Sequence, residues 1–82
     1  MTTSRFTLPP DVNSLLRSEL VRCIEEACLG ENDTLLAKRY LIDRWPQIDI
    51  AAEMGWTRST VSAHIPRIVQ RVQSTAHRLH MT

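Results

Sequence analysis

The 82-residue chain lacks the features of a membrane protein and of a secreted protein. No apolar run approaches the roughly 18 residues that a membrane-spanning helix needs. Residues 1–10 hold no long apolar segment of the kind found in a signal peptide. We therefore expect no membrane partner and a cytoplasmic location.

Motifs of catalysis and of metal binding are also missing. The chain has no glycine-rich phosphate loop, no HExxH metal motif and no Ser-His-Asp arrangement. Cys23 and Cys28 lie five residues apart on a predicted helix, so they point in different directions and do not easily bridge. His77 and His80 have no zinc-type spacing to these cysteines. The sequence predicts neither an enzyme nor a site for a metal or another cofactor.

The composition is typical of one soluble globular domain spanning residues 1–82. Hydrophobic residues make up 43% of the chain and charged residues 23%. This length is near the lower limit at which a single core stabilises a fold by itself. Small domains of this kind often gain stability by dimerising.

Charge is unevenly distributed, although the net charge is only +1. Residues 1–33 carry a net charge of −3, and residues 34–54 are balanced. From Gly55 onward there are four arginines and no acidic residue, a net charge of +4. A basic segment of this kind is typical of a surface that contacts nucleic acid.

Apolar spacing predicts an all-α fold, a small bundle of four or five helices. Residues 1–9 are mostly polar and predict an N-terminal arm. A first helix is expected from Val12 to Cys28, with Asp11 as its N-cap and Gly30 at its end. A second is expected from about residue 33 to 44. Its first turn could be capped by Asn32 or Asp33.

Residues 46–65 predict two short helices joined by a tight turn. Gly55 suits the left-handed conformation at the end of the first of these helices. Thr57 is placed to cap the second helix. Val61 and Ile65, four residues apart, would face the core. Together these positions indicate a helix-turn-helix.

This segment resembles the DNA-binding motif of Kor/TrfB-type plasmid repressors. The residues that carry the resemblance are Pro46, Gln47, Ala51, Gly55, Thr57, Arg58, Val61, Ser62 and Arg67. The same segment is similar to region 4 of bacterial sigma factors and to the LuxR-type output domain. The resemblance covers about a third of the chain, and Ala63 stands where the repressors tend to carry a longer polar residue. It implies a helix-turn-helix DNA-binding domain.

A second motif helix lying in the major groove would present its N-terminal and outer residues to the bases. The expected base-contacting residues are Arg58, Ser59, Ser62 and Ala63. Arg58 is the first candidate, because a guanidinium can bond the O6 and N7 atoms of guanine together; a phosphate contact is its alternative. The expected contacts to the DNA backbone are Gln47, Thr57, Arg67, Arg71, Lys38, Arg39 and Arg44. Thr57 could equally be only a cap, and the last three cations could be solvated.

Residues 66–82 predict a C-terminal helix. Pro66 indicates either a kink or a new helix that follows an end near His64. Apolar residues then recur at helical spacing, at Ile68, Val69, Val72, Ala76 and Leu79. They could pack on the domain's own core or form the seam of a homodimer. A dimer would contact two half-sites about one DNA turn apart.

Three functions are compatible with these patterns. The first is a sequence-specific transcriptional regulator, a repressor of plasmid, phage or other bacterial origin that binds double-stranded DNA. The second is an adaptor, similar to sigma region 4, that binds RNA polymerase or another regulator. The third is a subunit for DNA packaging or partition.

Overall fold

A computed structural model of the chain describes residues 8–81, and these residues form helices and no strand. The all-α prediction is therefore confirmed. The helical elements, in chain order, are α1 (Pro10–Asn13), α2 (Arg17–Glu26), α3 (Glu31–Ala37), the π-helix η1 (Lys38–Ile42), α4 (Gln47–Met54) and α5 (Arg58–Arg78).

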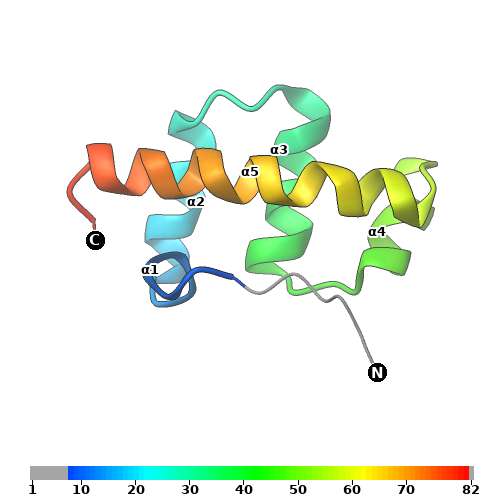
Figure 1. The fold of residues 1–82 in the computed structure, drawn as a ribbon, viewed down its shortest axis with the longest axis horizontal. Coiled ribbons are helices and arrows are strands. Elements are labelled where there is room, and N and C mark those ends of the chain that lie inside the picture. Colours follow the sequence, from blue (N-terminus) through cyan, green and yellow to red (C-terminus); the bar gives the residue numbers. More distant parts are fainter. Residues whose placement is uncertain (1–7, 82) are drawn as a thin grey trace.

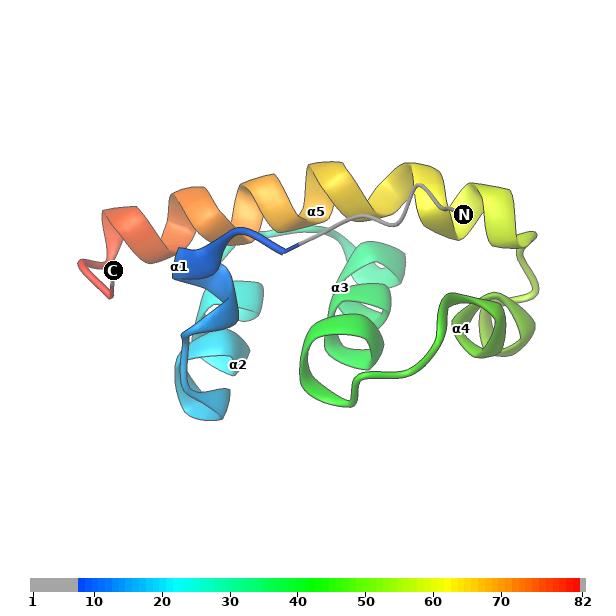
Figure 2. The same ribbon diagram turned by 60° about the horizontal axis from the view of Figure 1, so that its bottom comes forward.

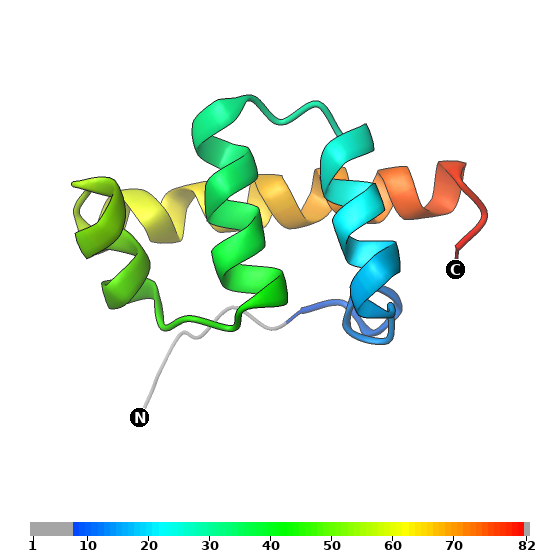
Figure 3. The ribbon, with the colours of Figure 1, turned by 180° about the vertical axis from the view of Figure 1, so that it is seen from behind.

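The longest helix, α5, lies across all the others. Figure 1 shows α5 in front of α2, α3 and α4, and Figure 3 shows the same arrangement from behind. In Figure 2 the helices α2, α3 and α4 form a layer beneath it. Contacts join α5 to α1, α2, α3 and α4, so one helix completes the core of the whole domain.

The inner face of α5 is apolar at intervals of three and four residues, as its position requires. Its buried apolar residues are Val61, Ile65, Ile68, Val69, Val72 and Ala76. They pack against Ile24 of α2, Leu36 of α3, Leu41 of η1 and Ile50 of α4 in one core cluster. Burial of one such aliphatic side chain contributes about 1.5–3 kcal/mol. This face is the main apolar support of the fold.

The single helix expected from Val12 to Cys28 is divided in two. Helix α1 ends at Asn13, and α2 begins only at Arg17, after an extended Leu16. The Leu16 amide donates instead to the Glu19 carboxylate at 2.8 Å, which satisfies one amide at the start of α2. The break places Leu15 in the core and leaves Leu16 66% exposed. Apolar periodicity did not show this change of direction.

The helix ends near Gly30 also differ from expectation. Helix α2 stops at Glu26, and Cys28 has a left-handed backbone with φ +53°. Gly30, with φ +92°, precedes α3 as its N-cap instead of ending the first helix. Neither Asn32 nor Asp33 caps α3, which begins earlier, at Glu31. Asp11 is not a cap either, because Pro9 occupies that position of α1.

The second expected helix changes geometry before it ends. Residues Lys38–Ile42 form a π-helix, and the backbone amide of Asp43 donates a hydrogen bond to the Lys38 carbonyl at 3.0 Å. Arg44 then has φ +61°, and the Trp45 amide donates a hydrogen bond to the Arg39 carbonyl at 2.9 Å. The segment thus closes in a left-handed turn that leads into Pro46, the N-cap of α4.

Helix α4, a tight turn and α5 follow the expected pattern closely. Gly55 has φ +69°, and the Trp56 amide donates to the Ala51 carbonyl at 2.9 Å, which closes α4. Thr57 caps α5 by accepting a hydrogen bond from the Thr60 amide at 3.2 Å. A new helix does not begin at Pro66, because α5 runs through it. Pro66 is exposed, so solvent can replace its missing hydrogen bond.

Candidate nucleic-acid interface

The four expected base-contacting residues share one exposed surface at the start of α5. Arg58, Ser59, Ser62 and Ala63 are all exposed, and together they line a shallow hollow. Their position follows from the helix, because Val61 and Ile65 turn fully into the core between them. This surface, which we call the α5 N-terminal face, offers a guanidinium, two hydroxyls and a methyl group.

Arg58 is the cation of this face. Among residues 8–81 it makes no side-chain hydrogen bond or ion pair within the chain. Its guanidinium therefore retains its full set of donors, which suits a planar acceptor such as a guanine edge or a phosphate.

Thr57 acts as a cap, which was one of its two expected roles. Its hydroxyl accepts from the Thr60 amide, and the two hydroxyl oxygens lie 2.9 Å apart. The side chain is nevertheless exposed at the start of α5, beside the α5 N-terminal face.

Gln47 begins α4, whose first amides receive no side-chain cap. The Oε1 atom of Gln47 is buried and lacks a hydrogen-bond partner within the described residues. The free amides give this end of α4 a partial positive charge, and Asp49 places a carboxylate in the same turn. The phosphate contact expected of Gln47 would have to use its Nε2 group, because the buried Oε1 atom can only accept a hydrogen bond.

Arg39 is held by intramolecular contacts, contrary to the expectation that it would contact DNA or be solvated. Its guanidinium lies 2.8 Å from the Glu53 carboxylate and 2.8 Å from the Asp43 carboxylate. It also stacks on Trp45, 4.7 Å from the ring centre. The hydrogen bonds to Glu53 and then to Asp43 raise the pKa of Arg39 above its usual range. This side chain connects η1 to α4.

Arg71 also has an internal partner. Its Nη2 atom donates to the Ala27 carbonyl at 2.8 Å, at the C-terminal end of α2. Arg78 reaches the neighbouring Glu26 carbonyl at 3.5 Å. Cations stabilise a helix C-terminus because its free carbonyls are partially negative. The basic C-terminal half of α5 thus caps α2, a role that the sequence pattern did not indicate.

Two further cations, Lys38 and Arg44, make no side-chain hydrogen bond or ion pair within residues 8–81. Lys38 is half-buried, and Arg44 is exposed. Both keep their charge available for an external anion.

Asp33, which sequence reasoning treated only as a possible cap, holds α5 to α3. One of its oxygens lies 2.9 Å from Nδ1 of His64, and the other lies 3.4 Å from Nη2 of Arg67. The His64 ring also packs on Trp56, with 4.8 Å between ring centres. His64 therefore packs at the interface between α3, α5 and the turn before α5. No local pattern joins Asp33 to residues more than 30 positions away.

The tentative dimer seam lies in the core of a single chain. Ile68, Val69, Val72 and Ala76 are each at most 2% exposed, and Leu79 is half-buried. These side chains pack on the domain's own core, the alternative considered from the sequence. Contacts between two copies would have to use other residues.

Part of the expected N-terminal arm lies outside the described residues. Residues 1–7, including Arg5, belong to that part, whereas Leu8 packs against the core.

Within residues 8–81, no three His, Cys, Asp or Glu side chains gather in a way that could hold a metal ion. Cys23 is buried, and burial raises the pKa of its thiol, whereas Cys28 is exposed. No helix in the described range has the length and apolar character to cross a membrane.

Comparison with known proteins gave no significant match to a protein-family model, to a curated protein or to a solved structure. The residues and geometry of the chain itself therefore indicate its function, above all the α5 N-terminal face and the start of α4.

Proposed function

We propose that this chain is a sequence-specific DNA-binding transcriptional regulator that acts as a repressor. The α5 N-terminal face would enter the major groove, with Arg58 as its main base contact. Gln47 at the start of α4, together with Lys38 and Arg44, would bind phosphates beside the groove. This assignment keeps the DNA-binding residues expected from the sequence, except Arg39, Arg67 and Arg71, whose guanidinium groups have internal partners.

One observation carries the proposal. Helix α5 presents three exposed donors, Arg58, Ser59 and Ser62, in its first two turns, directly after the tight turn that follows α4. The inner residues Val61 and Ile65 are fully buried, which fixes the rotation of this helix and makes the surface rigid. A rigid helix end with outward-facing donors and no carboxylate of its own suits the major groove.

A small interface of this kind gains specificity when two copies bind neighbouring half-sites. We expect an inverted-repeat operator occupied by a homodimer, with half-sites about one DNA turn apart. The buried face of α5 cannot supply the contact between copies. Contacts would come from exposed surfaces or through the DNA. Sedimentation of the complex on duplexes with one and two half-sites would measure the number of copies.

The proposal can be tested by selecting bound duplexes from a random pool and then titrating salt on the winning sequence. We expect an enriched inverted repeat, and affinity that falls steeply with salt. Arg58→Ala should reduce discrimination at one base pair by about 1–3 kcal/mol and leave the fold intact. Arg22→Ala, which removes an exposed arginine from α2, is the matched control. Unchanged operator binding by Arg58→Ala would contradict the assignment.

A protein-binding adaptor is the second candidate, and one observation favours it. Ile48, beside Gln47 at the start of α4, is 64% exposed and would offer an apolar contact to a protein partner. Two arginines, Arg39 and Arg67, are also paired with carboxylates of the same chain. An absence of enrichment over random DNA would favour this candidate, with RNA polymerase or another regulator as the partner. A packaging or partition subunit would bind DNA with little preference for sequence.

A further inference from the structure

Arg67 lies beside the proposed DNA-contacting surface. It follows Ala63 by four residues, so the two side chains are neighbours on the exposed surface of α5, one turn apart. The Arg67 side chain is 63% exposed. If Ala63 enters the groove, a guanidinium one turn further on is within reach of the phosphates at the groove edge.

Arg67 is nevertheless occupied by Asp33. The two side chains form an ion pair with an N–O distance of 3.4 Å. The Asp33 side chain is only 16% exposed and is fixed by His64, whose Nδ1 lies 2.9 Å from the other carboxylate oxygen. His64 in turn packs on Trp56 in the turn before α5. The carboxylate is therefore rigid, whereas its arginine partner is largely solvated.

We infer that Asp33 is a positioning residue that restrains Arg67 and so limits the affinity of the chain for DNA phosphate. This inference rests on the proposed DNA-binding function. A phosphate and the Asp33 carboxylate compete for the same guanidinium, so Arg67 can bind a phosphate only after the ion pair with Asp33 is broken. Removal of the carboxylate would release one cation to the DNA. The contact would be insensitive to sequence, because phosphates carry no base information.

The test is a double-mutant cycle with Asp33→Asn, Arg67→Ala and the combined variant. Binding to the selected operator and to a random duplex is measured across a salt titration. Asp33→Asn should raise affinity for both duplexes about two- to fivefold. It should also steepen the slope of log affinity against log salt by about 0.9, as one additional phosphate contact would. The combined variant should lose both gains.

Glu31→Gln is the matched control, because it removes the same charge from the first turn of α3 without touching Arg67. An equal gain from this variant, or a gain that survives in the combined variant, would mean that only net charge matters and would overturn the inference. Arg67→Ala alone provides a second measurement that does not depend on the folding of Asp33→Asn. Its salt slope should match that of the unaltered chain, and a slope shallower by about 0.9 would show that Asp33 does not restrain Arg67.

The proposed function and the role inferred for Asp33 are distinguished by separate outcomes. If the unaltered chain binds no duplex in the pool, both the proposed function and this inference fall. If it binds an operator but Asp33→Asn changes neither affinity nor salt slope, only the inference is overturned. Circular dichroism of each variant confirms that the compared chains are folded.

Discussion

The two halves of α5 carry arginines in very different surroundings. In the N-terminal half, Arg58 projects from an exposed surface and has no polar partner among the described residues. In the C-terminal half, Arg71 and Arg78 donate to carbonyls at the end of α2. Arg67 lies between them, paired with Asp33. The same residue type thus serves as an available donor at one end of the helix and as a structural tie at the other.

This difference limits how much of the basic segment after residue 54 is available to bind nucleic acid. The net charge of +4 after residue 54 remains, but Arg71 is hydrogen-bonded to an α2 carbonyl and Arg67 is paired with Asp33. Charge counted along a sequence measures the long-range field of a protein. Only the structure shows which guanidinium groups can leave their partners for a ligand.

The largest effect is expected on the inner face of the C-terminal half. Val72→Asp would place a carboxyl group at a fully buried position, at a cost of about 2–7 kcal/mol. Most of the stability of a small domain would be lost, so circular dichroism should show an unfolded chain. Gln70→Ala, at an exposed position of the same helix, is the control. If the parent chain is a dimer and Val72→Asp is a folded monomer, the inner face of α5 would instead be the dimer seam.

A smaller effect should separate Arg71 from Arg58. Arg71→Met keeps most of the side-chain volume but removes the cation at the α2 C-terminus, which should cost about 0.3–1 kcal/mol of stability. Urea unfolding measures this loss, and operator affinity should be unchanged. Arg58→Ala should show the reverse pattern. Weakened DNA binding with unaltered stability in Arg71→Met would return Arg71 to the set of DNA contacts.

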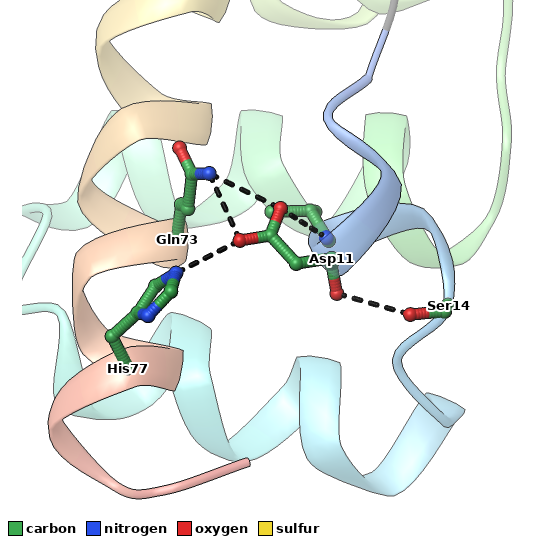
Figure 4. A network of polar contacts seen from close by, with 5 residues as sticks. Asp11, Ser14, Gln73 and His77 are labelled. Carbon is green, nitrogen blue, oxygen red and sulfur yellow. Dashed lines mark hydrogen bonds and ion pairs between the residues drawn. The ribbon is translucent and has the colours of Figure 1, made fainter. Parts of the chain in front are cut away.

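The smallest effect concerns pH, at the contact between α1 and the C-terminal half of α5. The Asp11 carboxylate accepts hydrogen bonds from Gln73 at 3.0 and 3.1 Å and lies 2.8 Å from Nε2 of His77 (Figure 4). The hydrogen bond from Gln73 and then the one from His77 lower the pKa of Asp11 below its usual value. Its stabilising contribution is therefore complete above about pH 4, the ordinary aspartate range, and is lost as pH falls through the lowered pKa.

Asp11→Asn should remove this part of the acid sensitivity. We expect the difference in urea midpoint between the parent and Asp11→Asn to shrink between pH 6 and pH 2, since protonation abolishes the same charge. Glu25→Gln, at an exposed position of α2, is the control for general charge effects. A difference that stays constant with pH would show that the carboxylate charge is not what stabilises this contact.

The sequence predicted the fold best at positions whose conformation depends on the residue type and on the next few residues in the chain. Gly55 adopts the expected left-handed conformation, and Thr57 caps α5 as expected. Val61 and Ile65 face the core, so the outward direction of Arg58 and Ser62 could also be predicted. Each of these features depends on neighbours within a few positions.

Features that depend on distant residues could not be predicted in this way. The division between α1 and α2 lets Asp11 meet Gln73 and His77, which lie more than 60 positions away. The internal partners of Arg71 and Arg67 lie 44 and 34 positions away. Apolar spacing identified the C-terminal stripe of α5 correctly, but the same spacing serves a core and a dimer seam equally. Only burial within one chain distinguishes them.

The order of the helices has a consequence for biosynthesis. The apolar residues of α2, α3, η1 and α4 are covered by α5, which follows them all in the chain. A nascent chain on the ribosome cannot bury them until most of α5 has emerged from the exit tunnel. Because α5 also carries the α5 N-terminal face, for which we propose DNA binding, that surface is held rigid only when the core closes. A truncated or partly synthesised chain would therefore present no competent copy of it.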